Sequence, residues 1–268
     1  MVTMRGSARG RALGGSLVRV VGDLGRLVVP VECPGCGSLD LMICAECRAL
    51  LAGPPSRCES SAPRLDHVDG RPQVPVWSLT PYTGPVRELV VAWKDRGRTD
   101  LTRVLSAALG AGAAELAPVL RAARLGSLAL LVVPAPSSAA ARRRRGADLV
   151  GQLAGAVAGS LAAAGVPAGA ESVLTQRRGM RDQVGLGARA RGGNVGGRVR
   201  WRARTPAPEP GQPVLLVDDV LTTGATLAAC ERAIETRGAV VVGGLTLAVT
   251  PPPGGFRMGP FCDVGATA

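Results

Sequence analysis

An acidic pair followed by a turn rich in threonine and glycine is the segment of this chain best suited to chemistry. Residues 214–227 read Val-Leu-Leu-Val-Asp-Asp-Val-Leu-Thr-Thr-Gly-Ala-Thr-Leu. The apolar run that begins at Val214 does not alternate with polar residues, which is typical of a strand buried on both faces of a parallel sheet. We therefore expect Asp218 and Asp219 at the carboxyl end of such a strand, where open α/β folds bind their ligands.

The groups in this segment suit the two ends of a ribose 5-phosphate. Two carboxylates can accept hydrogen bonds from a ribose diol or help to hold a divalent cation. The free N–H groups at the start of the following helix favour a phosphate, and Gly224 lets the backbone approach it closely. The residues expected to bind phosphate are Thr222, Thr223, Gly224, Ala225 and Thr226. The alternative, in which Thr223 is only a helix N-cap and the aspartates are solvated, stays open.

Four cysteines near the start of the chain have the spacing of a metal site. Cys33 and Cys36 form one Cys-x-x-Cys pair, and Cys44 and Cys47 form a second one seven residues later. Such pairs can fold back so that four thiolates surround a zinc ion, and the ion would be structural because no coordination position stays open. A redox pair, disulfides and unliganded thiols are the alternatives that the spacing leaves open.

The rest of the chain predicts an α/β domain behind the cysteine module. We expect a basic lead-in over residues 1–30, the module over 31–60, a linker over 61–76, the α/β domain over 77–250 and a tail over 251–268. Helices are expected at 86–93, 101–120, 147–164 and 225–237, and strands at 127–133, 171–174, 199–202, 214–218 and 240–249. Strands that alternate with helices predict a parallel sheet flanked by helices.

Composition limits the class of protein. The 268 residues are 46% hydrophobic, enough for a sizeable globular core. No uninterrupted apolar run reaches the roughly 18 residues that span a bilayer, so we expect no membrane span and a cytoplasmic protein. Charged residues interrupt the apolar stretch 17–29, which lacks the core of a signal peptide and would suit a short amphipathic helix or a helix docked on the protein itself.

The net charge of +12 is concentrated in one quarter of the chain. Residues 142–204 contain thirteen arginines and three acids, a local net charge of +10. Such a block attracts polyanions, either nucleic acid or a small molecule that carries pyrophosphate. Of the six aromatic residues only Trp201 lies within the block. Because single-stranded nucleic acid is usually stacked on aromatic side chains, we expect at most weak, salt-sensitive binding to single-stranded DNA.

The 214–227 segment resembles the motif that binds 5-phosphoribosyl 1-diphosphate (PRPP) in type I phosphoribosyltransferases, in which an acidic pair precedes a Thr-Gly phosphate loop. Further motifs make the chain similar to the ComF competence-protein family. They are the two cysteine pairs, Tyr82-Thr-Gly-Pro-Val-Arg87, Trp93-Lys94, Val133-Pro134-Ala135-Pro136 and Arg145-Gly146. The resemblance covers roughly residues 30–250. It implies a type I phosphoribosyltransferase-like parallel sheet flanked by helices, with a small N-terminal zinc-binding module.

The resemblance implies a pyrophosphate site after the predicted strand 127–133. Ser137, Ser138 and Arg145 would contact the pyrophosphate, with Lys94, the chain's only lysine, as a further phosphate ligand. A solvated basic turn and a helix C-terminal cap are the respective alternatives. Asp148 stands where the family has asparagine, which puts that one contact in doubt.

The resemblance also implies a loop that closes over the site. Gln183, Arg189 and Asn194 match the family's series in this loop. Closure would exclude water and bring arginine to the leaving group. A flexible surface loop is the alternative.

The activity implied by the resemblance is transfer of a phosphoribosyl group. PRPP would bind with Mg²⁺, and pyrophosphate would leave through an oxocarbenium-like state toward an unidentified acceptor such as a nucleobase. Asp218 and Asp219 are the expected catalytic residues because, with the phosphate loop, they would hold the ribose. A homodimer is one assembly that we consider. The other functions in view are a non-catalytic competence factor that handles incoming single-stranded DNA, and a ligand sensor that has kept the site but lost turnover.

Overall fold

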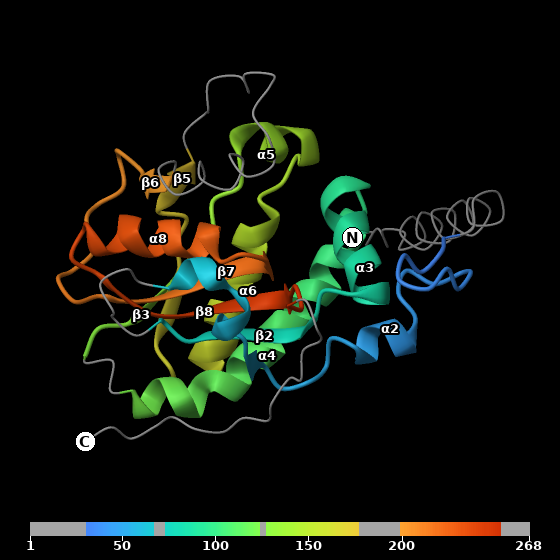
Figure 1. Cartoon of the computed structure of the whole chain (residues 1–268), viewed down its shortest axis with the longest axis horizontal. Helices are drawn as coiled ribbons and strands as arrows, with labels where there is room; N and C mark the ends of the chain where they lie inside the picture. The colour runs from blue at the N-terminus through green and yellow to red at the C-terminus, as the bar shows by residue number, and fades with distance from the viewer. Residues whose placement is uncertain (1–30, 67–72, 124–126, 177–198, 253–268) are drawn as a thin grey trace, which may run out of the picture.

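The computed structural model describes residues 31–66, 73–123, 127–176 and 199–252, and these ranges build a six-stranded sheet between two layers of helices (Figure 1). The strand order is β1-β2-β8-β7-β3-β4. Neighbouring strands are parallel throughout except for β1, which pairs antiparallel with β2 at one edge. The predicted α/β class with a mostly parallel sheet is therefore confirmed.

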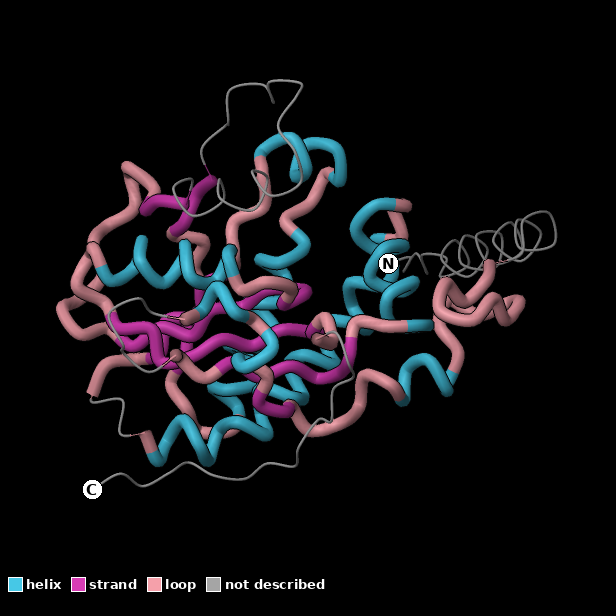
Figure 2. The backbone as a smooth tube through the Cα atoms, in the orientation of Figure 1, coloured by secondary structure: helices cyan, strands magenta, loops and turns pink. Residues whose placement is uncertain are grey.

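The elements have the following bounds. The strands are β1 Ser56–Arg57, β2 Val76–Pro81, β3 Leu130–Pro134, β4 Ala168–Ala170, β5 Leu174–Gln176, β6 Val199–Trp201, β7 Pro213–Leu221 and β8 Val240–Val249. The α-helices are α2 Ala45–Ala49, α3 Gly84–Asp95, α4 Thr102–Ala122, α5 Ala139–Arg145, α6 Leu149–Ala163 and α8 Ala225–Glu235. Three 3₁₀ turns are η1 Glu59–Ser61, η2 Pro63–Leu65 and η3 Thr99–Leu101. Figure 2 shows the antiparallel pair β5–β6 apart from the main sheet.

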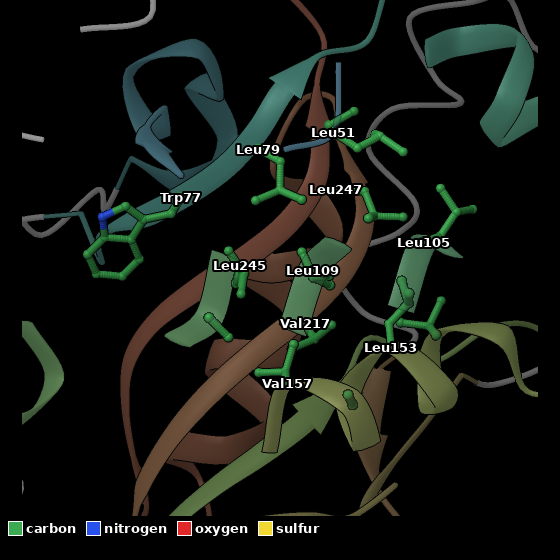
Figure 3. Close-up of a cluster of buried hydrophobic side chains, with 14 of the residues drawn as sticks. Leu51, Trp77, Leu79, Leu105, Leu109, Leu153, Val157, Val217, Leu245 and Leu247 are labelled. Atoms are coloured by element: carbon green, nitrogen blue, oxygen red, sulfur yellow. The ribbon is translucent and has the colours of Figure 1, made fainter. Parts of the chain in front are cut away.

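Strand β7 is buried on both faces of the sheet, as its unbroken apolar run predicts. Leu215 and Val217 pack into the cluster that contains residues of α4 and α6, part of which is drawn in Figure 3. Val214 and Leu216 point to the opposite face and pack with residues of α8. Because successive side chains of a strand alternate between faces, a strand covered by helices on both sides needs apolar residues at every position.

Helix α4 is a core helix of the domain. Together with η3 it covers Thr99–Ala122, the one helix among the described residues that is long and apolar enough to cross a membrane by length and composition. Leu105, Leu109 and Leu116 along it are fully buried. They belong to the same cluster as buried residues of α6 and the sheet.

Two of the predicted segments are wrong. The expected strand 171–174 is wrong, because the chain leaves the sheet at Glu171, whose N–H makes a last bond to the carbonyl of Val132. Strands β4 and β5 lie on either side of this turn. The expected linker is also wrong for residues 61–66, since Ala62 and Leu65 are fully buried there.

Two helix glycines test the close packing of α4 on α6. A Cβ atom on Gly110 of α4 would lie 2.6 Å from Oγ of Ser160 and 3.3 Å from the carbonyl oxygen of Ala156. A Cβ atom on the exposed Gly155 of α6 would meet nothing within 4 Å. We expect Gly155→Ala to raise the free energy of unfolding by about 0.5–1 kcal/mol and Gly110→Ala to lower it by about 1–3 kcal/mol. Urea denaturation measures both, and changes of the same sign would contradict this packing.

Candidate functional site

The site originates in a difference of length between β7 and its neighbour β3. The β3–β7 ladder ends where Pro134 lies opposite Val217, with one more bond from the Ala135 N–H to the Val217 carbonyl, 2.7 Å. On its other side β7 stays paired with β8 as far as Leu221. Residues 218–221 therefore keep one partner strand and leave their other edge open. Because the chain runs from β3 outward to β4 while β7 lies on the opposite side of β3, this edge is a topological switch point.

A polar cleft of about 410 Å³ lies at this edge. Its lining combines predicted site residues from four places in the sequence: Lys94, Ser137, Ser138, Arg145, Asp218, Asp219, Thr222 and Thr226. Thr223, Gly224 and Ala225 belong to the same loop but do not line the cleft. The structure thus brings most of the predicted ribose, phosphate and pyrophosphate groups to one cavity.

Lys94 forms an ion pair with Asp219, one of the two predicted aspartates. The sequence did not predict this ion pair. The Nζ of Lys94 lies 2.8 Å from Oδ2 of Asp219, and the Asp219 side chain is buried while that of Lys94 is half-buried. Burial alone would lower the pKa of Lys94, but the Asp219 carboxylate more than offsets this, so the pKa is raised. The ammonium therefore stays charged and neutralises one of the two acids.

Asp218 lies next to this ion pair, and Lys94 contacts Asp219 rather than Asp218. Burial and the neighbouring Asp219 carboxylate raise the pKa of Asp218 to about 8, against the opposing effects of the Asp219 N–H and of Lys94. That N–H donates to Oδ1 of Asp218 over 2.8 Å. Near neutral pH the ligand-free protein therefore tends to keep a proton on Asp218, and a ligand that brings a cation would favour the ionised form.

The loop between β7 and α8 has the geometry of a helix N-terminus that is open to an anion. Gly224, which precedes the helix, has the left-handed angle φ 79°. The hydroxyl of Thr223 accepts from the N–H of Ala225 over 3.4 Å, so it caps one of the first N–H groups. Thr222 and Thr226 face the cleft. Other N–H groups of a first helical turn have no partner within the helix and suit a phosphate.

The turn after β3 lines the same cleft as this loop. Ser138 is the N-cap of α5, since its hydroxyl accepts from the N–H of Ala141 over 3.1 Å. Arg142 donates to the carbonyl of Ser137 over 3.0 Å and so fixes the turn. Helix α5 itself was not predicted, because four of its seven residues are arginines with no apolar periodicity.

Arg145 joins this turn to the end of α3. Its Nε donates to the carbonyl of Lys94 over 2.7 Å, and Nη2 lies 3.6 Å from a carboxylate oxygen of Asp95. Gly146 ends α5 in the left-handed conformation, which explains the Arg-Gly step. Asp148 caps α6 by accepting from the N–H of Gly151 over 3.2 Å, and it does not line the cleft. This position therefore has a structural role as aspartate.

Gln183, Arg189 and Asn194 lie outside the described residues. The two described residues that flank this part of the chain, Gln176 and Val199, both line the cleft. Sequence reasoning did not select them, and it gave Tyr82 no role beyond its motif. Tyr82 reaches the cleft because it follows β2, where its N–H donates to the carbonyl of Val249 over 2.7 Å.

Trp201 offers no stacking surface for a nucleobase. Its side chain is only 6% exposed, and its indole N–H donates to the carbonyl of Thr205. Trp77 and Trp93 are also buried. The tryptophans of the described residues therefore belong to the core. They offer no stacking surface beside the arginine-rich segment 142–204.

The four predicted cysteines form a second candidate site. The sulfur atoms of Cys33, Cys36, Cys44 and Cys47 all lie within 4.8 Å of one another. A tetrahedral zinc ion with bonds of about 2.3 Å places its sulfurs roughly 3.8 Å apart, so the cluster fits a metal ion. Hydrogen bonds from Ser38 lower the pKa of Cys36 to about 6, which favours the thiolate.

The cysteine cluster is packed onto the α/β core. Arg98 donates to the carbonyls of Glu32 and Met42 over 3.0 and 3.3 Å, and its guanidinium is held by Asp100. A Cβ atom on Gly35 would lie 2.7 Å from Sγ of Cys47 and 3.3 Å from Pro85 at the start of α3. The module thus supports the helix that carries Lys94.

Comparison with known proteins finds a short relationship to phosphoribosyltransferases. No family model matches the chain. The chain is 44% identical over 52 residues to adenine phosphoribosyltransferase of Ralstonia nicotianae, which covers 19% of this chain and 26% of that relative. A solved structure of hypoxanthine phosphoribosyl transferase from Trypanosoma cruzi overlaps 61% of this chain and 70% of its own, with 19% identity and a TM-score of 0.33. The first match shows a phosphoribosyltransferase-like segment. Because the match spans only 26% of the relative, it does not show that this chain has the relative's activity.

The raised pKa of Asp218 gives a prediction for stability. Because this pKa is about 8 in the folded chain, above that of a solvated aspartate, the group contributes stability that is complete below about pH 4 and is lost as pH rises through about 8. Asp218→Asn cannot ionise. We therefore expect it to melt about 2–4 °C above the wild type at pH 8.5, the shift that roughly 1 kcal/mol produces, with a smaller difference at pH 5.

Asp219→Asn is the matched control for this measurement. It removes the partner of the half-buried Lys94, so it should lower the melting temperature. Scanning calorimetry at the two pH values compares the three proteins. A melting temperature of Asp218→Asn at or below that of the wild type at pH 8.5 would show that the Asp218 carboxylate is not strained by its surroundings.

Proposed function

We propose that this protein is a ComF-like phosphoribosyltransferase that binds PRPP with Mg²⁺ in the cleft at the end of β7. The observation that carries the proposal is the meeting of three kinds of group in one cavity of about 410 Å³. These groups are the acidic pair, the threonine loop at the start of α8, and the serine turn after β3. The phosphoribosyltransferase-like segment supports the same assignment.

Each group has a role that follows from its chemistry. The carboxylates of Asp218 and Asp219 would accept hydrogen bonds from the ribose hydroxyls, and the start of α8 would hold the 5-phosphate. The serine turn and Lys94 would face the pyrophosphate, whose Mg²⁺ arrives with the substrate. Lys94 lies 2.8 Å from Asp219, so it would be next to one of the carboxylates that hold the ribose. Catalysis would come from holding the ribose and neutralising the leaving group, without a covalent nucleophile.

A nucleobase is the acceptor class that we propose. The relative that shares the 52-residue segment is named for adenine. In this chain the lining of the cleft also includes Tyr82, Gln176 and Val199. An aromatic ring, an amide and an apolar side chain are groups that can contact a flat, polar ring.

Calorimetric titration with PRPP and Mg²⁺ tests the site. We expect saturable binding by the wild type and a loss of affinity of about 100-fold or more in the Asp218→Asn/Asp219→Asn double variant, because hydrogen bonds to charged groups contribute about 1.5–3 kcal/mol each. Asp40→Asn is the control, since Asp40 is exposed, lies in the cysteine module, and has a positive φ that asparagine also adopts. Absence of binding by folded wild type, or equal binding by the double variant, would refute the proposal.

We also propose that the cysteine cluster binds a structural zinc ion. Its support is the fit of the four sulfur atoms and the Gly35 backbone, which leaves room for Sγ of Cys47. Metal-bound thiolates persist where thiols stay reduced, so a cytoplasmic location goes with this proposal.

Zinc analysis of the purified protein tests this second proposal. We expect about one zinc ion per chain in the wild type and less than roughly 0.1 in Cys33→Ser, because a structural site needs all four ligands. Cys58→Ser should keep its zinc, since Cys58 is buried outside the cluster. If Cys33→Ser does not fold, chelation of the wild type gives the same information through a lower melting temperature. Zinc-free wild type of unchanged stability would contradict the assignment.

A further inference from the structure

The segment that follows the cysteine module packs directly beneath the phosphate loop. Helical turn η2 contacts α8, and Figure 1 shows the chain after α2 returning across the sheet toward that helix. The N–H of Arg64 donates to the carbonyl of Thr223 over 3.0 Å. Ala62 and Leu65 are 0% and 1% exposed. A part of the chain about 160 residues earlier in the sequence than the loop therefore forms its floor.

Two constraints require glycine at position 224: the backbone conformation of the turn and the close packing of Ala62 and Leu65. Its φ of 79° lies in the left-handed region, where glycine carries no steric penalty. A Cβ atom there would lie 2.7 Å from Cγ of Leu65 and 3.0 Å from Cβ of Ala62. The Leu65 side chain therefore occupies the space into which a side chain at Gly224, the residue before α8, would extend.

The floor is itself fixed to the sheet. Ser56 and Arg57 pair with β2, and the N–H of Cys58 donates to the carbonyl of Val76 over 2.8 Å. A carboxylate oxygen of Glu59 accepts from the N–H of Val76 over 3.2 Å. These bonds hold the start of η1 and η2 in place, so Leu65 meets the loop as part of a rigid support.

We propose that Leu65 is a positioning residue for the phosphate loop, holding residues 222–226 in the conformation that presents the start of α8 to an anion. The inference rests on the proposed function for the identity of that anion, a ribose 5-phosphate group. It adds a residue from outside the cleft, because Leu65 is not among the residues that line it. Leu65 lies next to Gly224, where a Cβ atom would be 2.7 Å from Cγ of Leu65.

Removal of the Leu65 side chain should let the loop leave its binding conformation. The substitution would leave a cavity next to Gly224. The strand pairing of β7 and the hydrogen bonds within α8 would remain. If the fraction of molecules with a competent loop falls to about one tenth, the apparent Kd rises roughly tenfold. Leu65→Met keeps the volume and should restore both loop order and affinity.

Hydrogen exchange tests the contact without any ligand. In Leu65→Ala, the amides of residues 222–226 should exchange faster than in the wild type, while those of Val214–Val217 stay protected. Leu161→Ala is the matched control, because Leu161 is a 0% exposed residue of α6 and belongs to the cluster on the other face of the sheet. It should leave exchange of the loop unchanged. Unchanged exchange of residues 222–226 in Leu65→Ala would overturn the proposal, whatever the protein binds.

Titration with ribose 5-phosphate then separates this inference from the proposed function. Weaker binding in Leu65→Ala, by roughly tenfold, with wild-type affinity in Leu161→Ala and Leu65→Met, supports the inference. Faster exchange with unchanged affinity overturns it, because the contact then does not set anion binding. Faster exchange in Leu65→Ala together with no binding by the wild type supports the positioning of the loop and rejects the ribose-phosphate assignment.

Discussion

The candidate site depends on one mismatch, the continuation of β7 past the end of β3. Pro134 and Pro136 stop β3, since proline lacks the N–H that would carry the ladder further. Strand β8 has no such stop and holds β7 straight for four more residues, 218–221. A pair of carboxylates is thereby fixed on a rigid strand whose other edge is open. The cleft, the loop before α8 and the turn before α5 all lie around this exposed edge.

This arrangement places charge where the core would otherwise exclude it. Asp219 is 5% exposed, and Lys94 neutralises it at 2.8 Å. Burial and the neighbouring Asp219 carboxylate raise the pKa of Asp218. Side chains with strongly shifted pKa values are common where a protein binds or transforms a charged ligand. The supports of the site are accordingly rigid: the cysteine module packs on the start of α3, and Leu65 packs beneath Gly224.

The sequence predicts the local parts of the site and misses the contacts that join them. β7, the start of α8 and the cysteine cluster follow from an unbroken apolar run, a turn and a short-range spacing. The Lys94–Asp219 pair joins residues 125 positions apart, and no local pattern indicates it. Strand β2 was missed because Ser78 and Thr80 interrupt its apolar residues and prolines flank it, although both side chains are buried in the sheet. The packing of Leu65 next to Gly224 was also missed, because residues 61–76 are polar and contain prolines, a composition typical of a linker.

An amide-resolved NMR titration of the wild type with PRPP and Mg²⁺ tests the account most directly. If the open edge of β7 is the ligand site, chemical-shift changes should saturate together at residues 135–138 after β3 and at residues 218–226, with the rest of the sheet unaffected. Such a pattern would place one ligand across both loops. Changes confined to the exposed arginines of the chain, or changes at one loop without the other, would contradict the central claim that the unequal ends of β3 and β7 build a single site.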